Sequence, residues 1–373
     1  MNPDPPPFHL GYRRSLDGIR GVAILFVVLV HDGIIRDTFG FIGINTFFVL
    51  SGFLITCLLV EEWDMSHDIR FRDFYVRRAL RLLPALITML IAFVVLAFFI
   101  DPRRKAIREF YEALRALFYF TNWARIFRIG RTVALVHTWS LSVEEQFYFT
   151  WPLILYFLLR KTSRTSLACW IFLGAFLSAV LRIGLFVGGT ESIGGNVFAG
   201  VNLERLHSGS DTRADSLLLG CFSGVLVSSN LLPRQRWFAS LLKILAMVSV
   251  PGLLAMGTLS FLEARMICVG WFLASIFAAI LIVYLVTASS SLFHRVLENP
   301  PLVFVGKISY GLYLWNYPML MVMQQHHYLV WNNLGFPWQN LIQLIPVFGA
   351  VIASYYLIER PCLQFKKRFQ VTE

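Results

Sequence analysis

Long runs of apolar residues alternate with short polar segments along most of the chain. A helix needs about 20 mostly apolar residues to cross roughly 30 Å of hydrocarbon. Ten blocks meet or approach that length: 18–35, 39–60, 82–100, 139–159, 167–187, 214–232, 238–256, 266–286, 302–323 and 341–357. The pattern predicts an all-α, polytopic integral membrane protein with about ten transmembrane helices. It forms one membrane domain, 18–360, between a short N-terminal tail, 1–17, and a basic C-terminal tail, 361–373.

Composition supports lipid as the solvent of this chain. Hydrophobic residues make up 57% of it and charged residues 15%, with a mean hydropathy of +0.64, whereas a soluble domain carries about a quarter charged residues. The five cysteines occur singly, without the spacing of a zinc site or of a disulfide framework. We therefore expect no metal site and no permanently bound cofactor.

The distribution of Lys and Arg predicts the orientation. With ten spans and both termini in the cytoplasm, 18 basic residues fall in cytoplasmic segments and 12 on the opposite side, as the positive-inside rule requires. The net charge of +11 therefore reflects topology, and we exclude a nucleic-acid partner. One basic loop, 101–131, is external in this arrangement. We expect it either to face substrate or to lie at the interface through its amphipathic segment YEALRALFYF.

The first span carries Arg20 near one end and His31, followed by Asp32, near the other. Eleven residues at 100° each return to within roughly 20° of the same helix face, and they separate the two positions by about 16 Å along it. Ionisable residues at membrane depth are costly, so each one needs a reason. An extended ligand could contact both side chains.

With this orientation, the remaining polar groups of the spans predict two levels. The basic level, at the cytoplasmic face, holds Arg20, Arg77, Arg78 and Arg81. The mixed level, toward the outside, holds Glu144, Glu145, Arg182, Asp211, Arg213, Asp215, Tyr313 and Asn316.

Structural readings compete with functional ones. Glu145 could close a capping box with Ser142, and Asp17 is expected to cap the first helix. The three arginines of 77–81 could be positive-inside anchors, and His31 could be a satisfied core residue. Ser51 is a weak candidate, because small residues at such positions usually serve helix packing. The other histidines are taken as non-catalytic: His9, His67, His137, His207, His294, His326 and His327.

Several motifs resemble the membrane-bound acyltransferase-3 family. They are LDGIRGVAILFVVLVH, FFVLSGFLI, VRRALRLLP, HTWSLSVEEQFYFTWPL, DTRADSLLLG, GKISYGLYLWN and a terminal IERP, in this order. The resemblance implies an acyl-CoA donor, such as acetyl-CoA, used as a co-substrate from the cytoplasm. It implies a hydroxyl acceptor on a sugar of lipopolysaccharide, exopolysaccharide, Nod factor or an antibiotic, and a glycan of the envelope or a secreted glycan is expected here. Because the sequence ends at Glu373, we expect no esterase-like domain of the kind that is fused to some relatives.

The resemblance also implies roles for individual residues. Arg20 and His31 match the family's Arg-x10-His pair, Glu144 and Glu145 match its acidic pair, and the arginines of 77–81 match a basic motif associated with coenzyme A. Asn316 departs from the family pattern, since many members have His there.

These matches lead to a mechanistic hypothesis. The catalytic residues are expected to be His31, Glu144, Glu145 and Arg182; the coenzyme A phosphates are expected on Arg20, Arg77, Arg78 and Arg81; and the acceptor is expected on Asp211, Arg213, Asp215, Tyr313 and Asn316. His31 is the general base, or it carries the acyl group. Glu144 or Glu145 orients the imidazole or binds sugar hydroxyls, and Arg182 neutralises that acid or holds the oxyanion.

Two other classes of function stay open at this point. One is a glycolipid transporter or flippase without covalent chemistry, although we see no repeat symmetry of the kind that transporters show. The other is an inactive acyltransferase acting as a scaffold, which rests on Asn316 alone. The expected partners are acyl-CoA, a carbohydrate or glycolipid acceptor and membrane lipids, and the oligomeric state is open.

Overall fold

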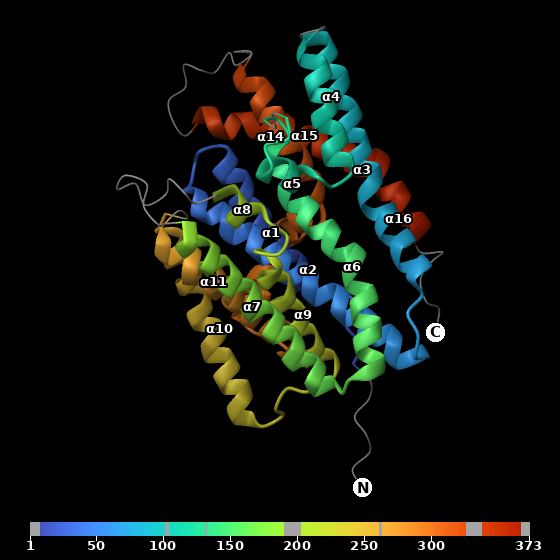
Figure 1. The fold of residues 1–373 in the computed structure, drawn as a ribbon, viewed down its shortest axis with the longest axis vertical. Coiled ribbons are helices and arrows are strands. Elements are labelled where there is room, and N and C mark those ends of the chain that lie inside the picture. The colour runs from blue at the N-terminus through green and yellow to red at the C-terminus, as the bar shows by residue number, and fades with distance from the viewer. Residues whose placement is uncertain are drawn as a thin grey trace.

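The structure, a computed structural model, describes residues 8–100, 104–130, 133–189, 203–260, 263–325 and 338–366. In these ranges every regular element is a helix, which confirms the predicted all-α class. The helices pack side by side, with α1 and α2 in the middle of the assembly (Figure 1). In chain order they are α1 (Arg14–His31), α2 (Asp37–Ser66), α3 (Phe71–Ile100), α4 (Arg104–Leu117), α5 (Thr121–Ile126), η1 (Val136–Thr138), α6 (Trp139–Lys161), α7 (Arg164–Gly189), α8 (Leu203–Ser208), α9 (Ala214–Ser228), α10 (Arg236–Gly257), η2 (Met266–Gly270), α11 (Trp271–Thr287), α12 (Leu292–Leu297), α13 (Pro300–Lys307), α14 (Ser309–Gln325), α15 (Trp338–Ser354), η3 (Tyr355–Glu359) and α16 (Arg360–Lys366).

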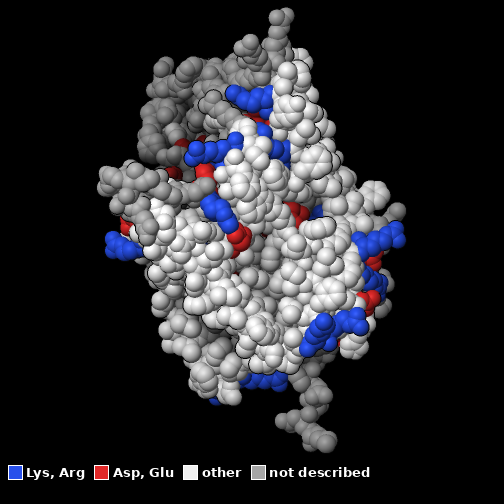
Figure 2. Space-filling view, in the orientation of Figure 1, with Lys and Arg blue, Asp and Glu red and all other residues white. Residues whose placement is uncertain are grey.

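Six helices in the described ranges are long and apolar enough to cross a membrane: Asp37–Ser66, Phe71–Phe99, Arg164–Gly189, Arg236–Gly257, Met266–Thr287 and Asn340–Phe365. Each overlaps a span predicted from the sequence, so the chain is a multi-pass membrane protein. Figure 2 shows a broad uncharged surface between the charged side chains that gather toward its upper part and along its lower right edge.

The count of ten spans is not confirmed. The other four predicted segments are helical, but they are shorter or more polar than a free-standing span. Helix α9 has 15 residues, or about 23 Å at 1.5 Å per residue, which is less than the roughly 30 Å of hydrocarbon. Helix α1 includes three charged side chains within 18 residues, α6 carries two glutamates, and the segment 302–323 is divided between α13 and α14.

Close packing of α2 against α9 fixes one wall of the site. A Cβ atom on Gly52 would lie 2.0 Å from the Leu217 carbonyl oxygen, and one on Gly220 would lie 2.0 Å from the Val49 carbonyl oxygen. Only glycine allows the two backbones to approach this closely. Ser51, next to Gly52, is thereby held at a fixed position on α2.

Helix α3 corrects the predicted boundary of the third span. It begins at Phe71 and has 30 residues, whereas the sequence predicted 82–100. The reason is that Arg77, Arg78 and Arg81 interrupt the apolar run without interrupting the helix, since arginine is a good helix former. These arginines therefore lie within the length of a membrane helix and not in a loop at its end.

The structure excludes the expected cap at Asp17 and the alternative interpretation of Glu145 as part of a capping box. Helix α1 begins at Arg14 with Arg13 at its N-cap, so Asp17 lies in the first turn, where it accepts hydrogen bonds from Tyr12 and Arg20. Helix α6 begins at Trp139 with Thr138 at its N-cap, so Ser142 is inside the helix and the capping box with Glu145 does not form. Both acids are free for other contacts.

The segment after α3 contains the predicted amphipathic helix, α4. Its apolar face contributes Ala113 and Ala116 to a core with α3, while Phe110 and Tyr111 are exposed. On the buried side, Glu112 accepts hydrogen bonds from the backbone N–H groups of 133–135, at 2.8–3.1 Å. This contact holds the segment that leads into η1 and α6.

Candidate active site

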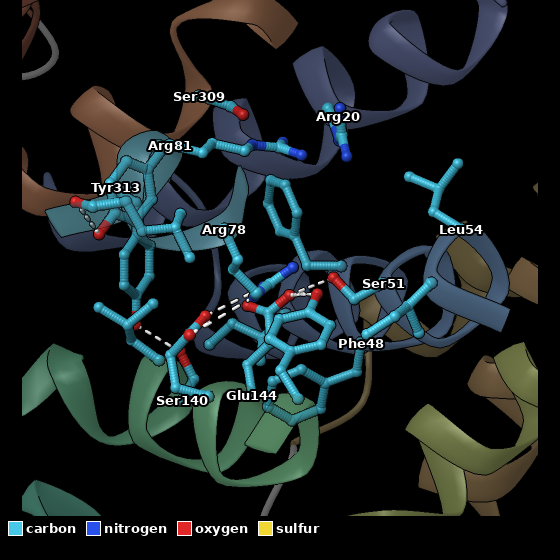
Figure 3. Close-up of a pocket in the computed structure, with 18 of the residues that line it drawn as sticks. Arg20, Phe48, Ser51, Leu54, Arg78, Arg81, Ser140, Glu144, Ser309 and Tyr313 are labelled. Atoms are coloured by element: carbon cyan, nitrogen blue, oxygen red, sulfur yellow. Dashed lines mark hydrogen bonds and ion pairs between the residues drawn. The ribbon is translucent and has the colours of Figure 1, made fainter. Parts of the chain in front are cut away.

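A pocket among α1, α2, α3, α6 and α14 collects six of the thirteen side chains predicted for the site. We call it the arginine pocket. Its polar lining residues are Arg20, Ser51, Arg78, Arg81, Ser140, Glu144, Glu145, Tyr148, Ser309, Tyr310 and Tyr313. Figure 3 shows side chains from all five helices turned toward this space.

One side of the arginine pocket is cationic. The guanidinium groups of Arg20 and Arg81 point toward each other beside Ser309 (Figure 3). The single ion pair of Arg20 in the described chain is with Asp17, at 3.4 Å, and Arg81 is exposed to the open space of the pocket. Two adjacent arginines with so little counter-charge form a site for an anion such as a phosphate.

The opposite side pairs acids with their neighbours. Glu145 accepts from Arg78, with an N–O distance of 3.0 Å. Glu144 accepts hydrogen bonds from Tyr148, at 2.5 Å, and from Ser51. The Arg78 guanidinium also lies over the Tyr148 ring, 2.8 Å from its centroid. The acids are therefore occupied within the pocket wall.

This pairing corrects the two predicted levels. Glu144 and Glu145 lie at the same depth as Arg78 and not at a separate outer level. The two levels were predicted from the distance of each residue to the end of its span. Helix α3 is about 45 Å long at 1.5 Å per residue and is longer than the membrane's hydrocarbon layer. The distance of Arg78 from the helix end therefore does not give its depth. The prediction that Glu144 or Glu145 orients the His31 imidazole also disagrees with the structure, because the partners of these glutamates are Arg78, Tyr148 and Ser51.

His31 ends α1 and is held by Asn316 of α14. The Nδ1–H of His31 donates to the Asn316 side-chain oxygen at 2.7 Å. Asn316 is buried, with 1% of its surface exposed. A proton on Nδ1 leaves Nε2 with a free lone pair, so the amide fixes the tautomer that a general base requires. The unusual Asn316 thus keeps a direct contact with His31.

The arginine pocket and His31 are linked through Tyr313 and His137. Tyr313 lines the pocket, and its hydroxyl lies 2.5 Å from Ser140 Oγ and donates to the His137 carbonyl. The His137 ring lies 5.4 Å from the Tyr313 ring and 6.4 Å from the His31 ring, between centroids. His31 is not among the residues lining the pocket, so a single pocket does not hold both Arg20 and His31, the two side chains that an extended ligand was predicted to contact.

Arg77 is the one member of its cluster that points elsewhere. It is paired with Glu62 of α2 at 3.5 Å and does not line the arginine pocket. Helix periodicity does not separate the three arginines, because Arg81 is three residues from Arg78 and four from Arg77; the difference lies in the pairing of Arg77 with Glu62. The prediction that Arg77 holds the donor therefore disagrees with its position.

A second group of predicted residues forms a separate, fully buried cluster at α7, α9 and η2, which we call the α7–α9 cluster: Arg182, Arg213 and Asp215. Arg182 and Asp215 form an ion pair at 2.6 Å with no exposed surface on either side chain. Arg182 also donates to the carbonyl oxygens of Thr212 and Ile267, at 2.8 and 3.1 Å.

Arg213 completes the α7–α9 cluster. Its guanidinium donates to Asn45 and lies 4.5 Å from the Phe41 ring centroid and 5.1 Å from that of Trp271. The structure thus corrects the prediction that Arg182 neutralises Glu144 or Glu145, because its carboxylate partner is Asp215. The cluster joins helices and is closed to a substrate. Asp211, beside it, is paired with Arg205 and is partly exposed.

Sequence reasoning missed two contacts of the site. Tyr148 was not singled out, although its spacing of four residues from Glu144 places both on one face of α6. His137 was set aside as a loop residue, although it is 4% exposed; its spacing of three residues from Ser140 was the available signal. His326 and His327 lie outside the described residues.

The fold and the site define a multi-pass membrane protein whose helices enclose a cationic pocket connected to a fixed imidazole. The chain belongs to the acyltransferase-3 family, since residues 13–360 match the family described as Acyltransferase domain.

Two curated relatives are similar to most of this chain. The peptidoglycan O-acetyltransferase OatA of Listeria monocytogenes is 30% identical over 94% of this chain and 56% of its own length. The O-acetyltransferase OatA of Staphylococcus aureus is 31% identical over 85% of this chain and 52% of its own length. The chain thus spans about half the length of these relatives. No solved structure matches it significantly.

Proposed function

We propose that this chain is a membrane-bound O-acyltransferase that moves an acetyl group from acetyl-CoA, taken from the cytoplasm, to a hydroxyl of an envelope carbohydrate. Family membership supports the acyl transfer. The names of the relatives support acetyl as the group and peptidoglycan as the class of acceptor. The observation that carries the proposal is the pair of accessible arginines in a pocket that is linked to His31.

We further propose ten membrane spans with both termini in the cytoplasm. The excess of Lys and Arg on that side supports the orientation, and each of the ten predicted segments coincides with helix. Two of the shorter or more polar helices, α1 and α9, pack against the long apolar helix α2. In this topology the mouth beside Arg20 and Arg81 faces the cytoplasm, where the donor is found.

In the donor complex, Arg20 and Arg81 bind phosphate oxygens of coenzyme A. Guanidinium groups suit this task because they remain charged and donate in a fixed planar fork. Arg78 is held by Glu145 and shapes the wall, while Ser51 and Tyr148 fix Glu144. The pantetheine arm passes Tyr313 toward His31.

The transfer itself needs one base. Nε2 of His31 removes the proton of the acceptor hydroxyl, and the oxygen lone pair forms the new C–O bond to the thioester carbonyl carbon. The carbonyl π electrons move to oxygen and return as the C–S bond breaks, with its electron pair leaving on sulphur. The thiolate then takes the proton from His31. Asn316 keeps Nδ1 protonated throughout, so that Nε2 is the basic atom.

The test is acetyl transfer by the purified chain in proteoliposomes, with radiolabelled acetyl-CoA and peptidoglycan fragments. We expect His31→Ala to lower kcat by about 10²–10⁴-fold and to leave acetyl-CoA binding within about threefold. His67→Asn, which changes an exposed histidine after α2, is the matched control and keeps full activity. Transfer by folded His31→Ala at the wild-type rate would refute the assignment, and a wild-type chain that transfers no label would refute the function.

A further inference from the structure

His137 is a second buried histidine in contact with the first. It lies in η1, directly before α6, with 4% of its surface exposed. Its ring centroid is 6.4 Å from that of His31 and 5.4 Å from that of Tyr317. Tyr317 in turn lies 5.0 Å from His31. The three rings therefore form one contiguous group at the end of α1.

Neither ring nitrogen of His137 makes a well-aligned hydrogen bond, although the Leu314 backbone lies within hydrogen-bonding reach of the ring. A neutral imidazole has one N–H donor and one acceptor nitrogen, so Leu314 serves at most one ring nitrogen and the other is left buried without a partner. Leaving such a group buried without a partner is destabilising. His294 shows the ordinary solution, because its two ring nitrogens contact Ser291 Oγ and the Leu285 carbonyl at 2.8 and 2.9 Å.

Other unpartnered polar atoms gather around the same point. Six of the sixteen buried side-chain nitrogen and oxygen atoms without a partner in the described chain belong to four residues that adjoin His31 or contact its neighbours: Asp32, His137, Asn316 and Asn340. Buried polar groups are rarely left unpaired, so this concentration indicates groups whose partner is a ligand. The unpaired atoms of Arg182 and Arg213 differ, since their guanidinium groups lie over aromatic rings.

The His137 backbone is well anchored. Its carbonyl accepts from the Tyr313 hydroxyl, and the preceding segment is held by the three hydrogen bonds of Glu112. Its ring packs against two tyrosines of α14. A donor fixed before the reaction needs no reorganisation when charge develops, which is what an oxyanion site requires.

We propose that His137 is a second catalytic residue, whose ring N–H donates a hydrogen bond to the oxyanion that forms beside His31. This proposal rests on the proposed function. When the acceptor oxygen bonds to the thioester carbon, the carbonyl π electrons move onto the oxygen, which accepts from His137. When the carbonyl re-forms and the C–S bond breaks, the hydrogen bond weakens again. His137 keeps its proton throughout, and all proton transfer is done by His31.

The experiment compares His137→Gln, which keeps an N–H donor, with His137→Leu and His137→Phe, which do not. Phenylalanine preserves the ring contacts with Tyr313 and Tyr317, so it covers the case in which His137→Leu does not fold. We expect both apolar variants to lose about 10²–10³-fold in kcat, with the KM for acetyl-CoA within about threefold. His137→Gln should stay within about tenfold of wild type, with the limbs of its pH–rate profile unmoved.

The matched control is His294→Gln, which should leave kcat unchanged. His294 is a partly buried histidine of α12, and both of its ring nitrogens have hydrogen-bond partners. A folded apolar variant with kcat within threefold of wild type would overturn the proposal. So would a displaced limb of the pH–rate profile in His137→Gln, because it would make His137 a titrating acid or base. In either case wild-type transfer and its loss in His31→Ala would still stand, so failure of this inference is distinct from failure of the function.

Discussion

The arginine pocket and the α7–α9 cluster are both groups of charged side chains inside the helix assembly, but they differ in access. In the pocket, Arg20 and Arg81 face open space beside Ser309. In the cluster, the Arg182 and Asp215 side chains have no exposed surface. The first group has cations left over for a ligand, and the second uses its cations to hold helices together.

The comparison shows why charge at membrane depth alone does not identify a functional site. Both groups carry the same cost of insertion. In the α7–α9 cluster, contacts within the protein offset this free-energy cost: one ion pair, hydrogen bonds to two backbone carbonyls and the aromatic rings next to Arg213. In the arginine pocket, contacts within the protein offset only part of the free-energy cost of insertion, because Arg81 is near other arginines. A cost that the protein does not offset indicates that a ligand binds there.

The largest expected effect is the loss of folded protein on breaking the α7–α9 cluster. Asp215→Ala leaves Arg182 and Arg213 as buried cations without a carboxylate, which costs about 3–5 kcal/mol. We expect a strong fall in the thermal midpoint of the detergent-solubilised protein and in the yield of its monodisperse fraction.

The double variant Arg182→Met with Asp215→Leu sharpens this expectation. It removes the charge together with its partner, so it should recover part of the lost stability. Recovery stays partial because the carbonyls of Thr212 and Ile267 lose their donor. An Asp215→Ala protein that melts like wild type yet cannot transfer acetyl groups would break the comparison and make the cluster part of the active site.

The next effect concerns the arginine pocket. Arg81→Gln removes one of the two cations proposed for phosphate, and a charge-assisted hydrogen bond of about 1.5–3 kcal/mol corresponds to about a 10–100-fold rise in the KM for acetyl-CoA. The thermal midpoint should not fall, since a cation beside Arg20 is removed. Steady-state kinetics and thermal melting measure the two quantities.

Arg77→Gln is the matched control for Arg81→Gln. It removes the same charge from the same helix, at a side chain that pairs with Glu62 outside the pocket. We expect the KM for acetyl-CoA to stay near wild type, with a loss of stability because the buried Glu62 carboxylate loses its partner. Equal increases in KM for both variants would mean that net charge near the mouth, and not the pocket geometry, binds the donor.

Much of the fold could be predicted from the sequence because apolar block length reports helix length in a membrane. All ten predicted segments are helical. What failed was inference about depth and ends. Arg77, Arg78 and Arg81 interrupt the apolar run, yet α3 continues through them from Phe71, since helix formation depends on backbone hydrogen bonds and tolerates arginine.

The candidate site was partly predictable for the same reason. Positions on one helix, such as Arg20 and His31 on α1 or Glu144 and Glu145 on α6, follow from periodicity and from family motifs. Pairing between helices does not, because it depends on tilt and stagger that a single sequence leaves open. Arg182 therefore received the wrong carboxylate, and His137 was missed because its neighbour His31 is more than a hundred residues away.

The smallest effect is at Asp211, which lies outside the helices at the edge of the α7–α9 cluster and offers a half-exposed counterpart to Asp215. Burial alone would raise its pKa, but the hydrogen bonds and charge of Arg205 outweigh burial and hold the pKa of Asp211 below its ordinary value. An aspartate whose pKa is lowered by folding stabilises the protein above its unfolded pKa of about 3.9, and this contribution disappears as the pH falls through the folded pKa. Asp211→Asn should therefore cost less than about 1 kcal/mol near pH 7, and the difference from wild type should shrink as the pH approaches 3. Thermal melting of both proteins across that range measures the convergence.

A constant difference in stability at every pH would assign the loss to the backbone contacts of 211 and 212 instead of the ion pair. A loss as large as that of Asp215→Ala would remove the distinction between exposed and buried ion pairs.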